Sequence, residues 1–391
     1  MRARVWTFLT QPEVVDEDRL RLVTTLLMAA GGLFFFRLKA LPALVGCLAG
    51  GGAVLAVLWA GFHRLGLRPL GGYWPGVARG VSVALLLFCL LPPGLPWVLA
   101  GLLGALAVAV EGVQRKALVP LAFSGVSLAW LLAWLWQSRA GTTYIAPFDF
   151  HAIDEPITLW LRFQVAVDPV RAYAGQVAGP LGATSFGLVA ICVLGLSYAR
   201  AVSWHLLLAF YIPVLAMVIL GQRPIPVYAL DAPALAFAAL VAADARRLPR
   251  SAAWRVAMGL GAGLVAAGLL YSGTGFHAFG IGVVACTAVV AVFQFFGLAG
   301  SPGALQRRSE ARRDRDPGTG DPDVAEPVPR RTSAVQVIAL SVALPLGLVL
   351  VWRDDTLRRS ERSALVTMGA VLYFLAIGLA LAWFWFLRIP T

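Results

Sequence analysis

The sequence predicts an all-α, polytopic membrane protein, and three observations carry this prediction. Hydrophobic residues make up 59% of the 391 residues and charged residues only 13%, about half the charged share of a typical soluble domain. The mean hydropathy of the chain is +0.79. Apolar runs of about 20 residues, the length that crosses a bilayer as a helix, recur along the chain with short polar or basic segments between them.

Length and hydropathy divide the chain into twelve expected helices. Ten of them form a body, at 21–37, 41–62, 77–92, 96–111, 118–136, 181–199, 203–220, 228–244, 254–271 and 276–298. The other two, 333–352 and 364–387, are expected to form a C-terminal hairpin within 333–391. The third and fourth helices are short, and the stretch 92–96 (PPGLP) separates them.

The remaining segments complete the predicted organisation. Residues 1–20 are polar and form an N-terminal segment, and the body extends over 21–298. Residues 299–332 are rich in Gly, Pro and charge, a composition that cannot bury a core, so we expect a disordered linker there. Each half of the body contains a short, glycine-rich span. That loose echo predicts a body built of two related halves.

The distribution of positive charge predicts the orientation. About two-thirds of the 32 lysine and arginine residues fall in the N-terminal segment and in every second loop after it, the bias of cytoplasmic loops in membrane proteins. We therefore expect both termini on the cytoplasmic side of a bacterial inner membrane and the loop 137–180 outside. The loop 353–363 departs from this pattern, because it is rich in arginine yet lies formally outside. The net charge of +12 is attributed to orientation in the lipid bilayer, and no nucleic-acid partner is expected.

The four cysteines, Cys47, Cys89, Cys192 and Cys286, lie singly within apolar runs. They lack CxxC or metal-ligand spacing, so they are interpreted as small core residues. The four histidines are equally scattered. No motif for a metal site is found.

Polar residues concentrate in one island, Gln137–Ser185, between two blocks of apolar helices. Its last seven residues, 179–185 (GPLGATS), form a turn that leads into a helix. The amide groups of such a turn and the helix N-terminus can hold a phosphate, which makes Gly182, Thr184 and Ser185 candidate ligand-binding residues. The alternative is an ordinary Thr or Ser N-cap after a glycine turn.

A second candidate is a run of acids with one histidine: Asp149, His151, Asp154 and Glu155. Such a cluster can carry protons or a cation. The alternative is that these are solvated loop charges.

Few ionisable residues lie inside the apolar runs, and charges inside a bilayer usually mark pathways or ion pairs. Glu111 and Asp244 stand at expected helix ends and are interpreted as interfacial, whereas Arg79 and Asp231 lie deeper. The ion or proton pathway candidates are therefore Asp231, Arg79, Asp154 and Glu155.

Four stretches follow one another in a recognisable order. They are SVALLLFCLLPPGLPWVLAGLLGALAV (82–108), TTYIAPFDFHAI (142–153), GPLGATSFGLVAICVLGLSYARAVSW (179–204) and ALDAPALAFAALVAADARRLPRSAAWRVAMGLGAGL (229–264). Over roughly residues 20–298 the chain resembles the D subunit of the Rnf electron-transport complex and its relative, the B subunit of the sodium-translocating NADH:quinone reductase. The last two expected helices have no counterpart in this resemblance.

The resemblance implies a flavin, with one departure. Family members attach FMN through its phosphate to the threonine of a Ser-Gly-Ala-Thr motif after the Ala-Pro-x-Asp segment. Here that place reads AIDEPIT (152–158), and only Thr158 could substitute. The letters Gly182-Ala183-Thr184 match part of the motif but stand in the later block. We therefore expect FMN or riboflavin to be bound without a covalent link, with Gly182, Thr184, Ser185 and Thr158 as the candidate residues.

The resemblance also implies the function. The chain is expected to be a membrane subunit of a redox-driven, ion-translocating electron-transport complex, with flavin at the outer face, rather than an enzyme alone. Its partners would be other membrane subunits and subunits that carry iron–sulfur and flavin groups. Two alternatives are a solute channel or transporter on the same repeat scaffold, and a scaffold subunit without a cofactor.

Overall fold

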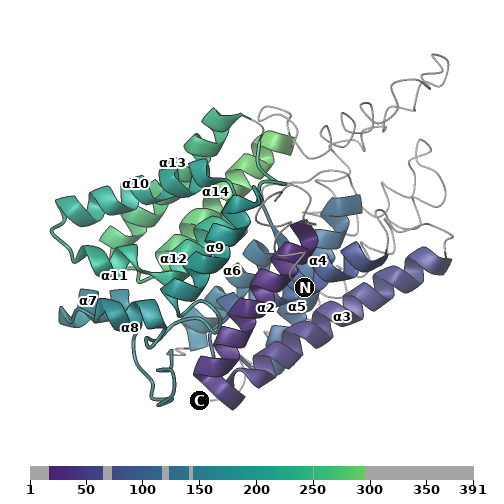
Figure 1. The fold of residues 1–391 in the computed structure, drawn as a ribbon, viewed down its shortest axis with the longest axis horizontal. Helices are drawn as coiled ribbons and strands as arrows, with labels where there is room; N and C mark the ends of the chain where they lie inside the picture. Colours follow the sequence, from purple (N-terminus) through teal and green to yellow (C-terminus); the bar gives the residue numbers. More distant parts are fainter. Residues whose placement is uncertain (1–16, 65–72, 117–122, 141–143, 250, 296–391) are drawn as a thin grey trace, which may run out of the picture.

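The computed structural model describes residues 17–64, 73–116, 123–140, 144–249 and 251–295. Every regular element in these ranges is helical, and β pairing occurs there only as two isolated bridges (Figure 1). The all-α prediction is confirmed for this part of the chain. Most of the N-terminal segment, the linker 299–332 and the hairpin 333–391 lie outside the described residues.

The first group of long helices overlaps the expected spans, although α6 begins at Gly125 rather than at 118 and ends at Ala140 rather than at 136. It comprises α2 (Glu17–Phe36), α3 (Leu41–Arg64), α4 (Tyr73–Leu90), α5 (Trp97–Lys116) and α6 (Gly125–Ala140), with a short 3-10 turn, η2 (Arg37–Lys39), between α2 and α3. The proline-rich stretch 92–96 separates α4 from α5 as expected, because proline lacks the amide hydrogen that a helix interior needs.

The second group begins after the island. It comprises α9 (Phe186–Tyr198), α10 (Trp204–Leu220), α11 (Ile225–Ala229), α12 (Ala232–Ala236), the π-helical η3 (Phe237–Ala242), α13 (Ala252–Tyr271) and α14 (His277–Phe295). The island, expected to be a loop, contains two short helices, α7 (Pro156–Phe163) and α8 (Pro169–Ala174).

The expectation of one continuous helix over 228–244 is wrong. The structure divides this stretch into α11, α12 and η3. Asp231 causes the break, because its side chain accepts a hydrogen bond from the amide of Ala234 at 2.8 Å and caps a new helix. Pro233 follows in the first turn of α12, the helix position that proline favours.

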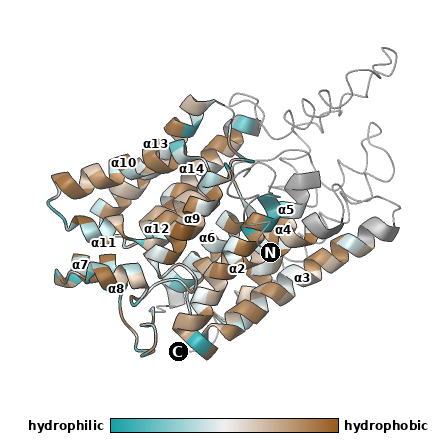
Figure 2. Ribbon diagram, viewed as in Figure 1, coloured by the Kyte–Doolittle hydropathy of each residue, from teal (hydrophilic) through white to brown (hydrophobic). Residues whose placement is uncertain are grey.

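Several helices are apolar enough for a bilayer. By length and composition, four stretches of the described chain could cross a membrane: Glu17–Lys39, Leu41–Ala60, Ile225–Ala242 and Ala252–Tyr271. Shorter apolar helices accompany them at Gly76–Leu90, Trp97–Gly112, Phe186–Tyr198, Trp204–Leu220 and His277–Val292. Hydrophobic residues dominate most helices in Figure 2. These helices indicate a membrane-embedded protein.

Glycines let two helix pairs approach closely. A Cβ at Gly50 of α3 would lie 1.9 Å from the carbonyl oxygen of Gly101 on α5, and one at Gly263 of α13 would lie 2.3 Å from the carbonyl oxygen of Phe210 on α10. In each pair, one helix has a second glycine four residues earlier, Gly46 or Gly259, in the same kind of contact. Small residues at this spacing drive helix association in lipid, where the hydrophobic effect contributes little.

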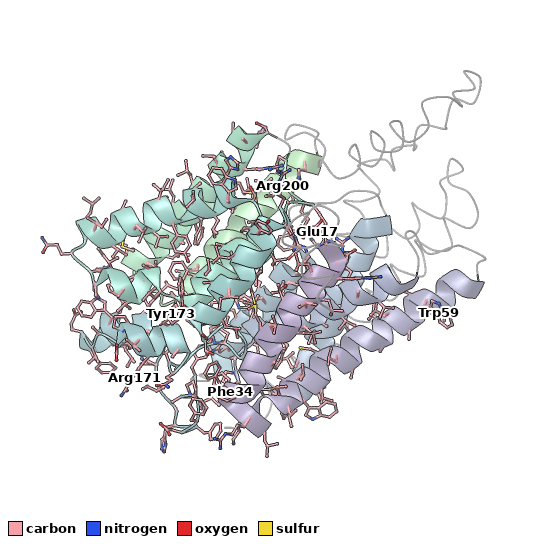
Figure 3. The ribbon with its side chains drawn as sticks, viewed as in Figure 1. Glu17, Phe34, Trp59, Arg171, Tyr173 and Arg200 are labelled. Carbon is pink, nitrogen blue, oxygen red and sulfur yellow. The ribbon has the colours of Figure 1, made fainter. Side chains whose placement is uncertain are left out.

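The termini of the helices gather at two opposite ends of the body. At the first, Arg21 near the start of α2 donates to the carbonyl oxygen of Ala201 at 2.7 Å. At the second, the amide of Phe148 in the island donates to the carbonyl oxygen of Phe35 at the other end of α2, at 3.2 Å. We call these the arginine end and the island end. Figure 3 shows Glu17 and Arg200 at the arginine end, and Phe34 and Arg171 at the island end.

Candidate functional site

A small cavity at the island end brings together residues from distant parts of the chain. Its lining includes Glu155 before α7, Thr184 before α9, Asp231 before α12 and Phe276 before α14. Within this cavity the centre of a water molecule can occupy a volume of about 20 Å³. That volume is room for about one water molecule. Three of the residues selected from the sequence, Glu155, Thr184 and Asp231, therefore share one site.

Glu155 points inward and is only 3% exposed. Its carboxylate caps α7 by accepting from the amide of Ile157 at 2.6 Å, and it accepts from the amide of Phe276 at 3.1 Å. The hydroxyl of Thr158 also donates to it. Burial raises the pKa of Glu155 above its ordinary value, and these hydrogen bonds only partly offset burial.

Asp231 is 6% exposed and caps α12. Its charge interacts with that of Glu155. The ion pairs among the described residues involve other acids, so neither Glu155 nor Asp231 has a positively charged partner there. Two buried carboxyl groups without a counter-ion are costly in a medium of low dielectric constant.

Thr184 is 2% exposed, and its hydroxyl oxygen has no hydrogen-bond partner in the part of the chain that the structure describes. The turn that holds it packs against the end of α4, where the amides of Leu181 and Gly182 donate to the carbonyl oxygens of Leu91 and Cys89, both at 3.0 Å. A Cβ at Gly182 would lie 2.5 Å from the Cys89 sulfur, so only glycine fits. Ser185 caps α9 by accepting from the amide of Leu188 at 3.2 Å.

These contacts test the fit of the flavin phosphate that the resemblance implies. Two of the turn's amides are already bonded to α4, and two carboxylates share the cavity with Thr184. The hydroxyl of Thr158 is engaged by Glu155. A phosphate would meet repulsion here rather than donors, so these residues fit a water molecule or a small cation, not a phosphate. Binding of FMN or riboflavin by Gly182, Thr184, Ser185 and Thr158 stays a prediction, and these contacts do not favour it.

A second cavity lies at the arginine end, with about 40 Å³ open to the centres of water molecules. Arg79 donates to Glu111 at 2.6 Å, and Arg247 contacts the other oxygen of the same carboxylate. Arg21 pairs with Asp244 at 2.9 Å. Arg246, Glu17 and Asp18 complete this arginine network, in which four arginines face four acids.

The arginine network includes two acids that were interpreted as interfacial. Glu111 and Asp244 lie at the arginine end, where each is 5% exposed and is paired inside the network. Burial alone would raise the pKa of Asp244, but Arg21 and Arg246 outweigh burial and hold its pKa well below the usual range. Sequence reasoning missed Arg21 and Arg247. The available signal was the recurrence of charge at the same end of successive helices.

Apolar rings lie between the two cavities along α12 and η3. Pro233 lines the island-end cavity and Leu240 lines the arginine-end cavity, so Phe237 stands between them in the chain. Phe237 is fully buried and packs edge-on against Trp130, with ring centroids 4.6 Å apart. The two polar cavities can therefore each hold a charged group, while the apolar layer around Phe237 keeps a continuous chain of water molecules from joining them.

The acid–histidine cluster of the island does not assemble. Asp149 and His151 are exposed, and Asp154 pairs with Arg162 at 3.2 Å on the surface. Of that run, Glu155 alone turns inward. Arg79, the remaining pathway candidate, belongs to the arginine network.

No protein-family model matches the chain, and a search of curated proteins found no match either. The resemblance to the Rnf D subunit therefore stays a prediction.

Proposed function

We propose that the protein is a membrane subunit of a redox-driven electron-transport complex and that it moves protons or small cations across the bilayer. The supporting observation is the cavity shared by Glu155, Asp231 and Thr184. Buried acids without counter-ions are rare in membrane proteins, and they mark ion or proton pathways. The redox role rests on the resemblance alone.

The helix packing supports a body of ten helices in two related halves. In the first half, α2 packs on α4, α3 on α5 and α5 on α6; in the second, α9 packs on α12, α10 on α13 and α13 on α14. The first half begins at the arginine end and the second at the island end, so the halves are inverted. Inverted repeats with a broken helix at the binding site are typical of secondary transporters. Here α12 begins at the break beside Asp231.

The assignment of partners follows from the cysteines, three of which are buried singly while the fourth is half-buried. We assign the iron–sulfur centres to partner subunits, and the family resemblance places FMN or riboflavin, held without a covalent bond, at the outer face. In the same proposal both termini are cytoplasmic and the island faces outward from a bacterial inner membrane.

A solute channel or transporter is the second candidate function, because inverted repeats serve transporters equally well. The cavities argue against a large solute, since the island-end cavity admits about one water molecule. A scaffold subunit without a cofactor is the third.

Transport by the intact complex tests the proposal. Inverted membrane vesicles containing the full chain and its native partners would be supplied with the electron donor of the complex. Ion uptake and electron transfer would then be recorded together. We expect Asp231→Asn to lower ion uptake at least tenfold, because it removes a pathway acid and changes little else.

The matched control is Asp154→Asn, the same chemical change at a surface acid of the same end, which should stay within twofold of wild type. Equal uptake by wild type and Asp231→Asn would refute the proposed pathway. Uptake of a small neutral solute by proteoliposomes of this chain alone would favour the transporter.

A further inference from the structure

We propose that Glu155, Asp231 and Thr184 form a proton-binding site in which the two carboxyl groups share one proton through a single water molecule. This deepens the proposed function by naming the ion, and it rests on that function only for the claim that the proton is transported.

The positions of the two carboxyl groups are fixed by the fold. Each is an N-cap, Glu155 of α7 and Asp231 of α12, and each accepts a backbone amide hydrogen bond, at 2.6 Å and 2.8 Å respectively. A third backbone amide, from Phe276 before α14, also donates to Glu155. Three helix starts therefore hold the pair against one cavity, and neither acid can turn to solvent without uncapping a helix.

The like charges of the Glu155 and Asp231 carboxylates require a bound proton in this cavity. Glu155 and Asp231 interact electrostatically and have no positively charged partner among the described residues. Two like charges that share a buried site cannot both stay ionised at moderate cost, so such pairs titrate as a unit and keep one proton. The proton removes one charge and supplies a donor for the other carboxylate.

Thr184 is independent support for a ligand here. Thr184 lines the same cavity, and its hydroxyl oxygen is buried without a hydrogen-bond partner among the described residues. A buried water needs two to four polar partners. Glu155, Asp231 and Thr184 supply three, and a hydroxyl can both donate and accept.

The other ionisable groups nearby form no ion pair with Glu155 or Asp231 among the described residues. The hydroxyl of Tyr211 on α10 and the Nδ1 atom of His277, which follows Phe276, are buried without a hydrogen-bond partner in that part of the chain, and Tyr144 donates to Gln137. Arg223, a cation on the same side of the body, donates to the Tyr228 hydroxyl and the Leu270 carbonyl oxygen, both at 3.2 Å.

Metal cations that bind oxygen take about six ligands, more than this cavity offers. Both oxygens of Glu155 already accept hydrogen bonds, and the cavity has room for about one water. A proton needs only the lone pairs that remain.

Infrared difference spectroscopy of the purified full chain tests the site without any transport assay. We would follow the carbonyl stretch of protonated carboxyl groups between about pH 5 and pH 9, above the range in which exposed acids titrate. Wild type should show one band that disappears only at alkaline pH. Asp231→Asn and Glu155→Gln should each move that loss to lower pH by one unit or more. The double variant should lack the band.

Thr184→Val should shift the band frequency, Thr184→Ser should restore it, and Asp154→Asn should leave it unchanged. Absence of the band in wild type, or its persistence in the double variant, would overturn the proposal. Loss of the band on adding sodium chloride at constant pH would also overturn it, in favour of a metal cation. If the band behaves as expected but vesicles with Asp231→Asn still take up ions as wild type does, the proton-binding site is supported and the proposed transport function is refuted.

Discussion

Replacing Glu111 by glutamine should destabilise the protein more than the loss of any surface charge, because this one carboxylate holds two arginines. Arg79 donates to Glu111 through two nitrogens, at 2.9 and 2.6 Å, and Arg247 contacts the second oxygen. The amide of glutamine keeps the shape but removes the charge. Arg79 and Arg247 would then face each other with no carboxylate between them.

The magnitude follows from burial. The side chains of Glu111 and Arg247 are 7% exposed and that of Arg79 is 20% exposed, so water cannot replace the lost charge. Breaking a buried pair by removing one partner costs about 3–5 kcal/mol. Arg247 keeps a second contact, with Asp244 at 3.4 Å, so we place the loss near the middle of that range, about 4 kcal/mol. For a body of this size that corresponds to a fall in Tm of about 10 °C.

The cysteines provide the assay. Cys47, Cys89 and Cys192 are buried and free, so a thiol-reactive fluorophore should report their exposure as the detergent-solubilised chain unfolds on heating. Asp154→Asn breaks the exposed pair with Arg162, which contributes about 0–1 kcal/mol, and serves as the control with almost no change in Tm.

A double variant separates charge from packing. In Arg79→Leu/Glu111→Leu both charges of one pair are absent and Arg247 still has Asp244, so most of the lost stability should return. A Glu111→Gln protein that unfolds within about 2 °C of wild type would refute the reasoning, since it would mean that Glu111 contributes less than about 1 kcal/mol.

Two further predictions concern acid stability and topology. The ion pairs that depress the pKa of Asp244 stabilise the folded state above the unfolded pKa of about 3.9, and this stabilisation is lost as pH falls through the folded pKa. The Tm of wild type should therefore fall steeply below about pH 4, whereas the Tm of Asp244→Asn should be lower at neutral pH and should depend less on pH. Parallel curves of Tm against pH for the two proteins would contradict this. A membrane-impermeant maleimide should label Asp149→Cys in intact cells and Arg19→Cys only after permeabilisation. Both positions are exposed, and they lie at opposite ends of the body. The reverse labelling pattern would overturn the predicted orientation.

Local sequence patterns are enough to predict the class of the protein and the positions of most described helices. Hydropathy, helix length and the breaking effect of proline are local properties, so α2, α3 and α5 begin and end close to the expected residues. The burial of Cys47, Cys89 and Cys192 was predictable for the same reason. The break within 228–244 was missed because the hydropathy of that stretch is continuous, while the cap at Asp231 depends on backbone geometry.

Which polar residues form a site depends on how the helices pack in three dimensions. Asp154 and Glu155 are neighbours in the sequence, yet one pairs with Arg162 on the surface and the other receives the amide of Phe276, 121 residues away. Arg21 and Asp244 meet across 223 residues. A sequence shows which residues carry charge, but burial and pairing arise from helices that pack across long separations. The water-sized cavity beside Thr184 belongs to that packing, because the starts of α7, α9, α12 and α14 must meet to enclose it.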